Sequence, residues 1–84
     1  MVTLLYFASL RERLGRSREQ VALPSASATV ATLVEHLRSR DERWSDALGS
    51  GQPWRVAVNQ RMADPATPLK PGDEVAFFPP VTGG

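Results

Sequence analysis

The chain has 84 residues, no cysteine, one histidine, and ten basic against nine acidic side chains, which gives a net charge of +1. This length predicts a single domain, and the lack of cysteine excludes a disulfide scaffold, a thiolate nucleophile, an iron–sulfur cluster and a Cys-type zinc site. A single histidine, His36, also excludes a His-rich metal site, and the small net charge gives no electrostatic reason to expect nucleic acid or a membrane as a partner. Because so short a chain has little room for catalytic machinery, we expect a partner to supply any active site.

The N-terminal segment predicts a strand that is apolar on both faces. Such a strand is either covered twice or keeps one face for a partner. The segment lacks a basic leader and is interrupted at Arg11, far short of a membrane-spanning length, so we expect a cytoplasmic protein. One face of residues 1–8 carries Val2, Leu4 and Tyr6, and the other carries Leu5 and Phe7.

The remaining elements follow from periodicity and from turn-forming residues. Thr29 is a candidate N-cap, and the apolar residues after it recur with the spacing of an amphipathic helix. Asn59 and Gln60 predict a tight turn between two strands. In chain order we expect a helical turn at 9–15, a strand at 18–23, the main helix from 30, a short helix at 41–48, strands at 54–58 and 61–62, and a last strand at 74–78.

This order predicts an α+β fold with one main helix packed on one face of a mixed sheet. In such an arrangement the first and last strands commonly lie side by side at the centre, which is the β-grasp, or ubiquitin-like, architecture. We expect residues 1–78 to form this domain and residues 79–84 to form an extended C-terminal tail.

The last strand shows the same two-faced pattern as the first. Val75 and Phe77 alternate with Ala76 and Phe78. One interpretation is that Phe78, Leu5, Phe7 and Met62 form an exposed apolar patch, which on a small protein marks a partner surface. The alternative is that all of them belong to the core.

The C-terminal residues combine two conformationally restricted prolines with two terminal glycines. Pro79 and Pro80 restrict φ and favour an extended path away from the sheet. Gly83 and Gly84 have no Cβ, so the end of the chain can pass through a slot too narrow for side chains. The ionised α-carboxylate of Gly84 is the one chemically distinctive group that the tail presents.

Several segments resemble one known family. The run from Gly72 to Gly84 resembles the C-terminal signature of the MoaD-type ubiquitin-like sulfur carriers, the small subunits of molybdopterin synthase. The resemblance extends over essentially the whole chain. It includes Leu5-Tyr6-Phe7-Ala8, Arg11-Glu12, Val58-Asn59 and residues 41–48 around Arg43-Trp44, with Met62 where a leucine would also be expected.

The resemblance implies a function for the tail. An E1-like adenylyltransferase/sulfurtransferase would use ATP to adenylate Gly84 and would convert it to a thiocarboxylate. That group would donate sulfur to cyclic pyranopterin monophosphate in the active site of the large synthase subunit. Gly83 would give clearance, and Pro79, Pro80, Val81 and Thr82 would form the inserted stem.

The resemblance also implies a docking face and an assembly. Phe7, Met62 and Phe78 would contact the partner, with Arg11 beside them. Two small and two large subunits would form a heterotetramer. The chain would not be catalytic by itself and would bind no metal or cofactor, because the activating enzyme binds the ATP.

Three other functions stay open at this point. A sulfur carrier for thiamine biosynthesis also ends in Gly-Gly. A ubiquitin-like modifier would be joined through Gly84 to lysines of target proteins. A non-covalent β-grasp binding module would have an incidental tail.

Overall fold

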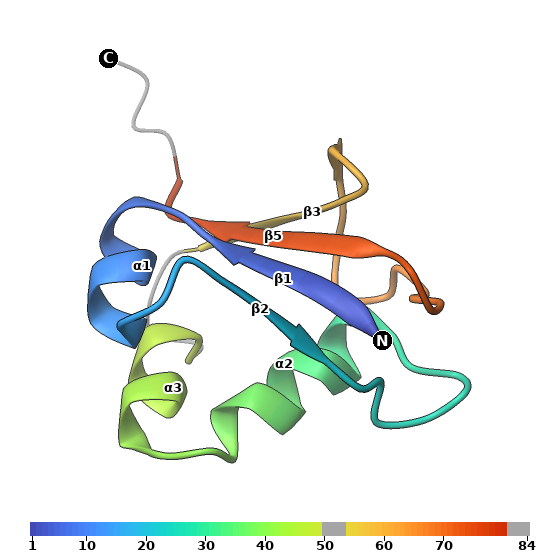
Figure 1. Cartoon of the computed structure of the whole chain (residues 1–84), viewed down its shortest axis with the longest axis horizontal. Coiled ribbons are helices and arrows are strands. Elements are labelled where there is room, and N and C mark those ends of the chain that lie inside the picture. Colours follow the sequence, from blue (N-terminus) through green and yellow to red (C-terminus); the bar gives the residue numbers. More distant parts are fainter. Residues whose placement is uncertain (50–53, 81–84) are drawn as a thin grey trace.

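The computed structural model describes residues 1–49 and 54–80. Its strands form one sheet in the order β2-β1-β5-β3-β4, in which the central neighbours β1 and β5 are parallel and the other neighbours are antiparallel (Figure 1). This arrangement confirms the α+β, β-grasp prediction. The elements are β1 (Val2–Tyr6), α1 (Ala8–Leu14), β2 (Arg18–Val21), α2 (Val30–Arg38), α3 (Glu42–Ala47), β3 (Arg55–Val58), β4 (Arg61–Met62) and β5 (Glu74–Phe78).

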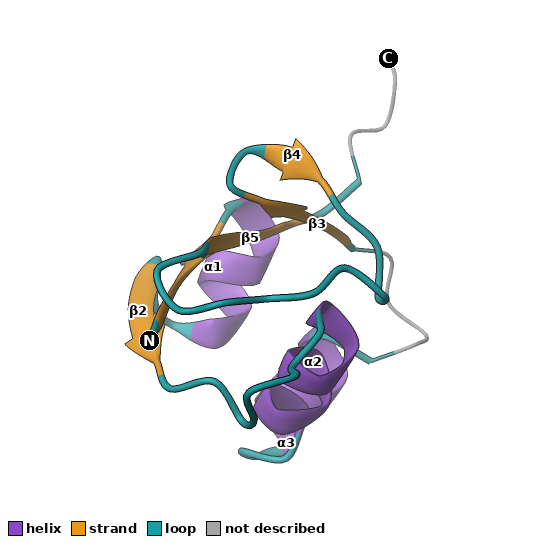
Figure 2. Ribbon diagram, turned by 90° about the vertical axis from the view of Figure 1, so that its right-hand side faces the viewer, coloured by secondary structure: helices purple, strands orange, loops and turns teal. Residues whose placement is uncertain are grey.

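The core lies between the sheet and its helices. Figure 2 shows α2 and α3 together on one side of the strands. The apolar side chains on that side of the sheet are almost completely buried, and Phe77 at the centre stacks on Tyr6 with 5.9 Å between ring centroids. The sheet contributes Val2, Leu4, Tyr6, Val21, Val56, Val58, Val75 and Phe77 to the core, and the helices contribute Leu10, Leu14, Val30, Leu33, Val34, Leu37, Trp44 and Ala47.

Helix α2 begins at the predicted cap. The Thr29 hydroxyl accepts a hydrogen bond from the backbone N–H of Thr32, and the Thr32 hydroxyl accepts one from the backbone N–H of Thr29. This reciprocal pair satisfies N–H groups that have no partner within the helix. The predicted apolar positions, which include Leu33 and Leu37, all face the core, and His36 is exposed as expected for a surface histidine.

A polar network, not anticipated from the sequence, links β1, β2 and the loop before α3. The Glu19 carboxylate accepts hydrogen bonds from the Tyr6 hydroxyl at 2.7 Å, from Arg40 at 2.8 Å and from Arg16 at 3.2 Å. The Arg40 guanidinium also lies 4.4 Å from the centroid of the Trp44 ring. Burial alone would raise the pKa of Glu19, but the hydrogen bonds from Arg40 and Tyr6 outweigh burial, so its pKa is lowered.

A second polar contact fixes the start of β5. Asn59 and Gln60 both have positive φ, 52° and 67°, and form the predicted turn between β3 and β4. The buried Asp73 carboxylate accepts hydrogen bonds from the Asn59 amide at 3.0 Å and from the backbone N–H of Lys70 at 2.9 Å. Burial raises the pKa of Asp73, but these hydrogen bonds reverse the effect and lower its pKa.

Candidate functional site

The face of the sheet opposite the core carries an apolar row. In the strand register Leu5 lies beside Ala76, Ala76 beside Ala57, and Ala57 beside Met62, and residues that pair directly across strands point to the same face. These side chains are half-buried or exposed, and Met62 is 64% exposed. We call this surface the outward face and define it as Leu5, Phe7, Ala57, Met62, Ala76 and Phe78.

Two aromatic residues complete the outward face at the end where the tail begins. Phe7 directly follows β1 with extended backbone angles, so it continues the alternation of Leu5, and 46% of it is exposed. Phe78 is half-buried at the end of β5. The backbone N–H of Phe7 donates to the Phe77 carbonyl at 3.1 Å, which holds the two segments side by side.

A sharp turn positions α1 next to this end of the sheet. Ala8 has a φ of 54°, so the chain turns immediately after Phe7 and enters the helix. The backbone N–H of Arg11 lies 3.4 Å from the Phe7 carbonyl, one helical turn along α1, and Arg11 is exposed. The predicted docking residues Phe7, Phe78 and Arg11 therefore lie at one end of the domain.

The structure decides between the two interpretations of the apolar residues. Phe7 and Met62 are surface residues, so the alternative that places them in the core is wrong. Leu5 and Phe78 are half-buried, and the strand register places both on the same side of the sheet as Ala76. Whether the outward face binds a partner is not tested by this placement, and that role stays a prediction.

The predicted tail follows the last strand directly. Strand β5 ends at Phe78, and Pro79 and Pro80 continue away from the body of the domain (Figure 1). These two prolines start next to the aromatic end of the outward face. The other predicted tail residues lie outside the described part of the chain: Val81, Thr82, Gly83 and Gly84.

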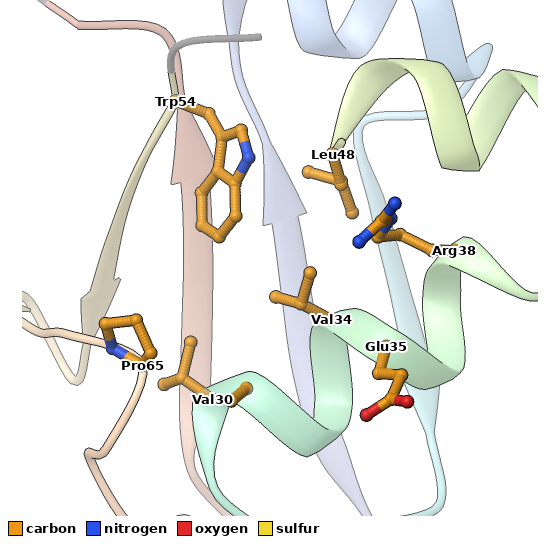
Figure 3. A pocket seen from close by; sticks show the side chains of 8 residues that line it. Val30, Val34, Glu35, Arg38, Leu48, Trp54 and Pro65 are labelled. Carbon is orange, nitrogen blue, oxygen red and sulfur yellow. The ribbon is translucent and has the colours of Figure 1, made fainter. Parts of the chain in front are cut away.

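A hollow of about 320 Å³ lies on the other side of the sheet, against α2. Figure 3 shows the apolar side chains of Val34, Leu48 and Trp54 turned toward it, with Glu35 and Arg38 at one side. None of the predicted site residues lines this hollow. Glu35 and Arg38 are the charged side chains among the described residues that line it.

Residues 1–49 and 54–80 contain neither a metal-binding cluster nor a membrane-spanning helix. No group of three or more His, Asp or Glu side chains there is arranged to hold a metal ion. None of the helices in these two ranges has the length and apolar character needed to cross a bilayer.

Comparison with known proteins identifies the family. The family model described as "ThiS family" matches residues 4–84. The molybdopterin synthase sulfur carrier subunit of Escherichia coli is 44% identical over 84 residues, with both chains covered completely. The corresponding subunit of Haemophilus influenzae is 40% identical, again over the whole of both chains.

A solved structure agrees with this result. SAMP1 from Haloferax volcanii superposes with a TM-score of 0.77 at 28% identity, and the match covers 99% of this chain and 98% of that one. The same fold is therefore kept where the sequences have diverged considerably. The chain belongs to the ThiS family of β-grasp proteins, together with the molybdopterin synthase sulfur carrier subunits that it matches from end to end.

Proposed function

We propose that this chain is the sulfur carrier subunit of a molybdopterin synthase. The observation that carries the proposal is the 44% identity to the molybdopterin synthase sulfur carrier subunit of Escherichia coli, in an alignment that covers both chains completely. The geometry supports it, because the tail begins beside the outward face. A partner that covers this face can therefore receive the tail at the same time.

In this proposal the chain has two working parts. Residues 1–78 form the docking domain, in which Phe7, Met62 and Phe78 contact the large subunit and Arg11 lies at the edge of the contact. Residues 79–84 form the tail that enters the active site of the large subunit. Two small and two large subunits assemble into a heterotetramer, which we expect to be cytoplasmic.

The chemistry takes place at the carboxylate of Gly84. A carboxylate is a poor electrophile, so an E1-like enzyme first transfers the AMP moiety of ATP to it and releases pyrophosphate. A sulfur nucleophile then displaces AMP, and the chain ends in a thiocarboxylate. Gly83 leaves room for this group in both partner active sites, because it has no side chain.

The thiocarboxylate is the sulfur donor for the synthase. In the active site of the large subunit the sulfur of this group forms a bond to cyclic pyranopterin monophosphate, and water then hydrolyses the bond between Gly84 and sulfur, so that Gly84 returns to the carboxylate. Two such transfers supply the two sulfur atoms of the molybdopterin dithiolene. The ATP belongs to the activating enzyme, so the chain itself is the sulfur-donating co-substrate.

Intact-mass measurement tests the proposal. After incubation with the activating enzyme, ATP and a sulfur donor, the wild-type chain is expected to exchange one oxygen for sulfur. Deletion of Gly84, and extension of the chain by one alanine after Gly84, are both expected to abolish this change. A wild-type chain that never gains sulfur in the presence of an active activating enzyme contradicts the proposal.

One observation favours a second function. SAMP1 of Haloferax volcanii is described as small archaeal modifier protein 1, which suggests that a chain of this fold can also be joined to other proteins. A modifier role predicts isopeptide bonds between Gly84 and lysines of target proteins. Mass spectrometry of tryptic peptides from cell extract distinguishes the roles, because a pure sulfur carrier leaves no such branched peptides.

A further inference from the structure

Two arginines flank the outward face. Arg18 of β2 pairs directly with Leu5, and Arg55 of β3 pairs directly with Phe78, so both side chains point to the same side as the apolar row. Both residues are exposed. Neither forms an ion pair or a side-chain hydrogen bond with any residue in the described part of the chain.

Two arginines near Arg18 differ from it in having a carboxylate partner. Arg16 and Arg40 both contact the Glu19 carboxylate, and both guanidinium groups lie over the Trp44 ring. Arg18 is only two residues from Arg16, but its side chain points to the opposite face. Within the described residues, neither Arg18 nor Arg55 therefore has an ion-pair partner.

The register fixes the distance between these two cations. From β2 across β1 and β5 to β3 there are three inter-strand spacings, and Arg55 lies two residues along β3 from Ala57, the residue in line with Arg18. These spacings place the two Cα atoms about 16 Å apart. Half-buried apolar side chains lie between them, including Leu5 and Ala76. Glu74, an acidic residue on this face, lies beside Thr3, at the end away from the tail.

We propose that Arg18 and Arg55 determine which protein surface docks on the outward face. The partner surface is apolar at its centre and presents carboxylates at two opposite edges, one of them close to the point where the tail enters. This inference rests on the proposed function, in which the partner is the large synthase subunit. Charges at the edge of an apolar contact accelerate association and disfavour wrong partners more than they tighten the complex.

Binding kinetics of the full-length chain with the large subunit test this inference. We expect Arg18→Glu and Arg55→Glu each to slow association by about 3- to 10-fold at low salt, with a smaller effect on dissociation. The lysine variants Arg18→Lys and Arg55→Lys keep the charge and are expected to restore most of the rate. The double glutamate variant is expected to lose most of the salt dependence that the wild type shows.

Arg61→Glu is the matched control. Arg61 is exposed on the neighbouring strand β4, but it pairs with Val58 and so belongs to the core side of the sheet. We expect its association rate to stay within about two-fold of wild type. Equal rates for wild type and both outward-face variants, or an equal loss in Arg61→Glu, would overturn the inference. Absence of wild-type binding contradicts the proposed function, and with it the partner named here.

Discussion

Replacement of Glu19 by glutamine tests whether the polar network holds the sheet to α3. The Glu19 side chain is only 13% exposed, and its carboxylate accepts hydrogen bonds from Tyr6, Arg40 and Arg16. The amide of Glu19→Gln is close to the carboxylate in size, and its oxygen can still accept the hydrogen bond from Tyr6. The variant thus removes the negative charge from both arginines with little change in packing.

The expected loss of stability follows from the exposure of each contact. Arg40 is 27% exposed and Arg16 is 47% exposed, so the two ion pairs together are worth about 1–2 kcal/mol. Glu19→Ala also leaves the buried Tyr6 hydroxyl without its acceptor, which brings the loss to about 2–4 kcal/mol. In a domain of this size 1 kcal/mol lowers the melting temperature by about 4–8 °C, so both losses are measurable.

The pH dependence gives an independent check. Because folding lowers the pKa of Glu19 from its ordinary value of 4.5, the ionised carboxylate stabilises the fold above about pH 4.5, and this contribution is lost as the pH falls through the folded-state pKa. Chemical denaturation at pH 7 and pH 3 measures it. The difference in unfolding free energy between wild type and Glu19→Gln is expected to shrink at pH 3. Asp73, whose pKa is also lowered, loses part of its own contribution in acid, but it does so equally in both proteins. A gap below about 0.5 kcal/mol at pH 7, or one that does not shrink in acid, refutes the reasoning.

Three further predictions concern the turn, the buried carboxylate and the exposed methionine. Gln60→Gly is expected to stabilise the fold by about 0.5–1 kcal/mol in thermal denaturation, because Gln60 has a φ of 67°, and a loss of stability would contradict this. Asp73→Asn is expected to lower the free energy of unfolding by about 1–3 kcal/mol, because the new amide places an N–H donor against the N–H donors of Asn59 or Lys70. A urea denaturation midpoint equal to that of wild type would contradict this prediction. Oxidation of Met62 by hydrogen peroxide is expected to weaken binding to the large subunit severalfold, whereas peroxide-treated Met62→Leu binds as before treatment, and equal losses in both would contradict a role for Met62.

The sequence predicts the elements whose pattern is local. The apolar spacing after Thr29 identifies α2, and alternation divides the residues of β1 and β5 into the two sets that the structure places on opposite faces of the sheet. Alternation leaves open whether the second set is exposed or part of the core, and the exposure of Phe7 and Met62 answers that question. Patterns of this kind need only the residues of one element, so they can be read without the fold.

Contacts between distant segments could not be predicted in this way. Arg40 reaches Glu19 across 21 positions of the chain, and Asn59 reaches Asp73 across 14. Neither pair has a spacing that a helix or a hairpin would bring together, so each depends on the completed sheet. The placement of Arg18 and Arg55 on one face likewise requires the register of β1 with β5 and of β5 with β3.

Arg18 and Glu19 show how one strand separates stability from docking. They are neighbours in β2, but Glu19 pairs with Leu4 on the core side and Arg18 pairs with Leu5 on the outward face. Arg18→Glu is therefore expected to slow association with the large subunit and to leave the melting temperature within about 2 °C of wild type, because Arg18 has no partner among the described residues. Glu19→Gln is expected to do the reverse, lowering the melting temperature while the association rate of the folded protein is unchanged. If both variants change both quantities together, the two faces of the sheet are coupled, and the outward face is not an independent docking surface.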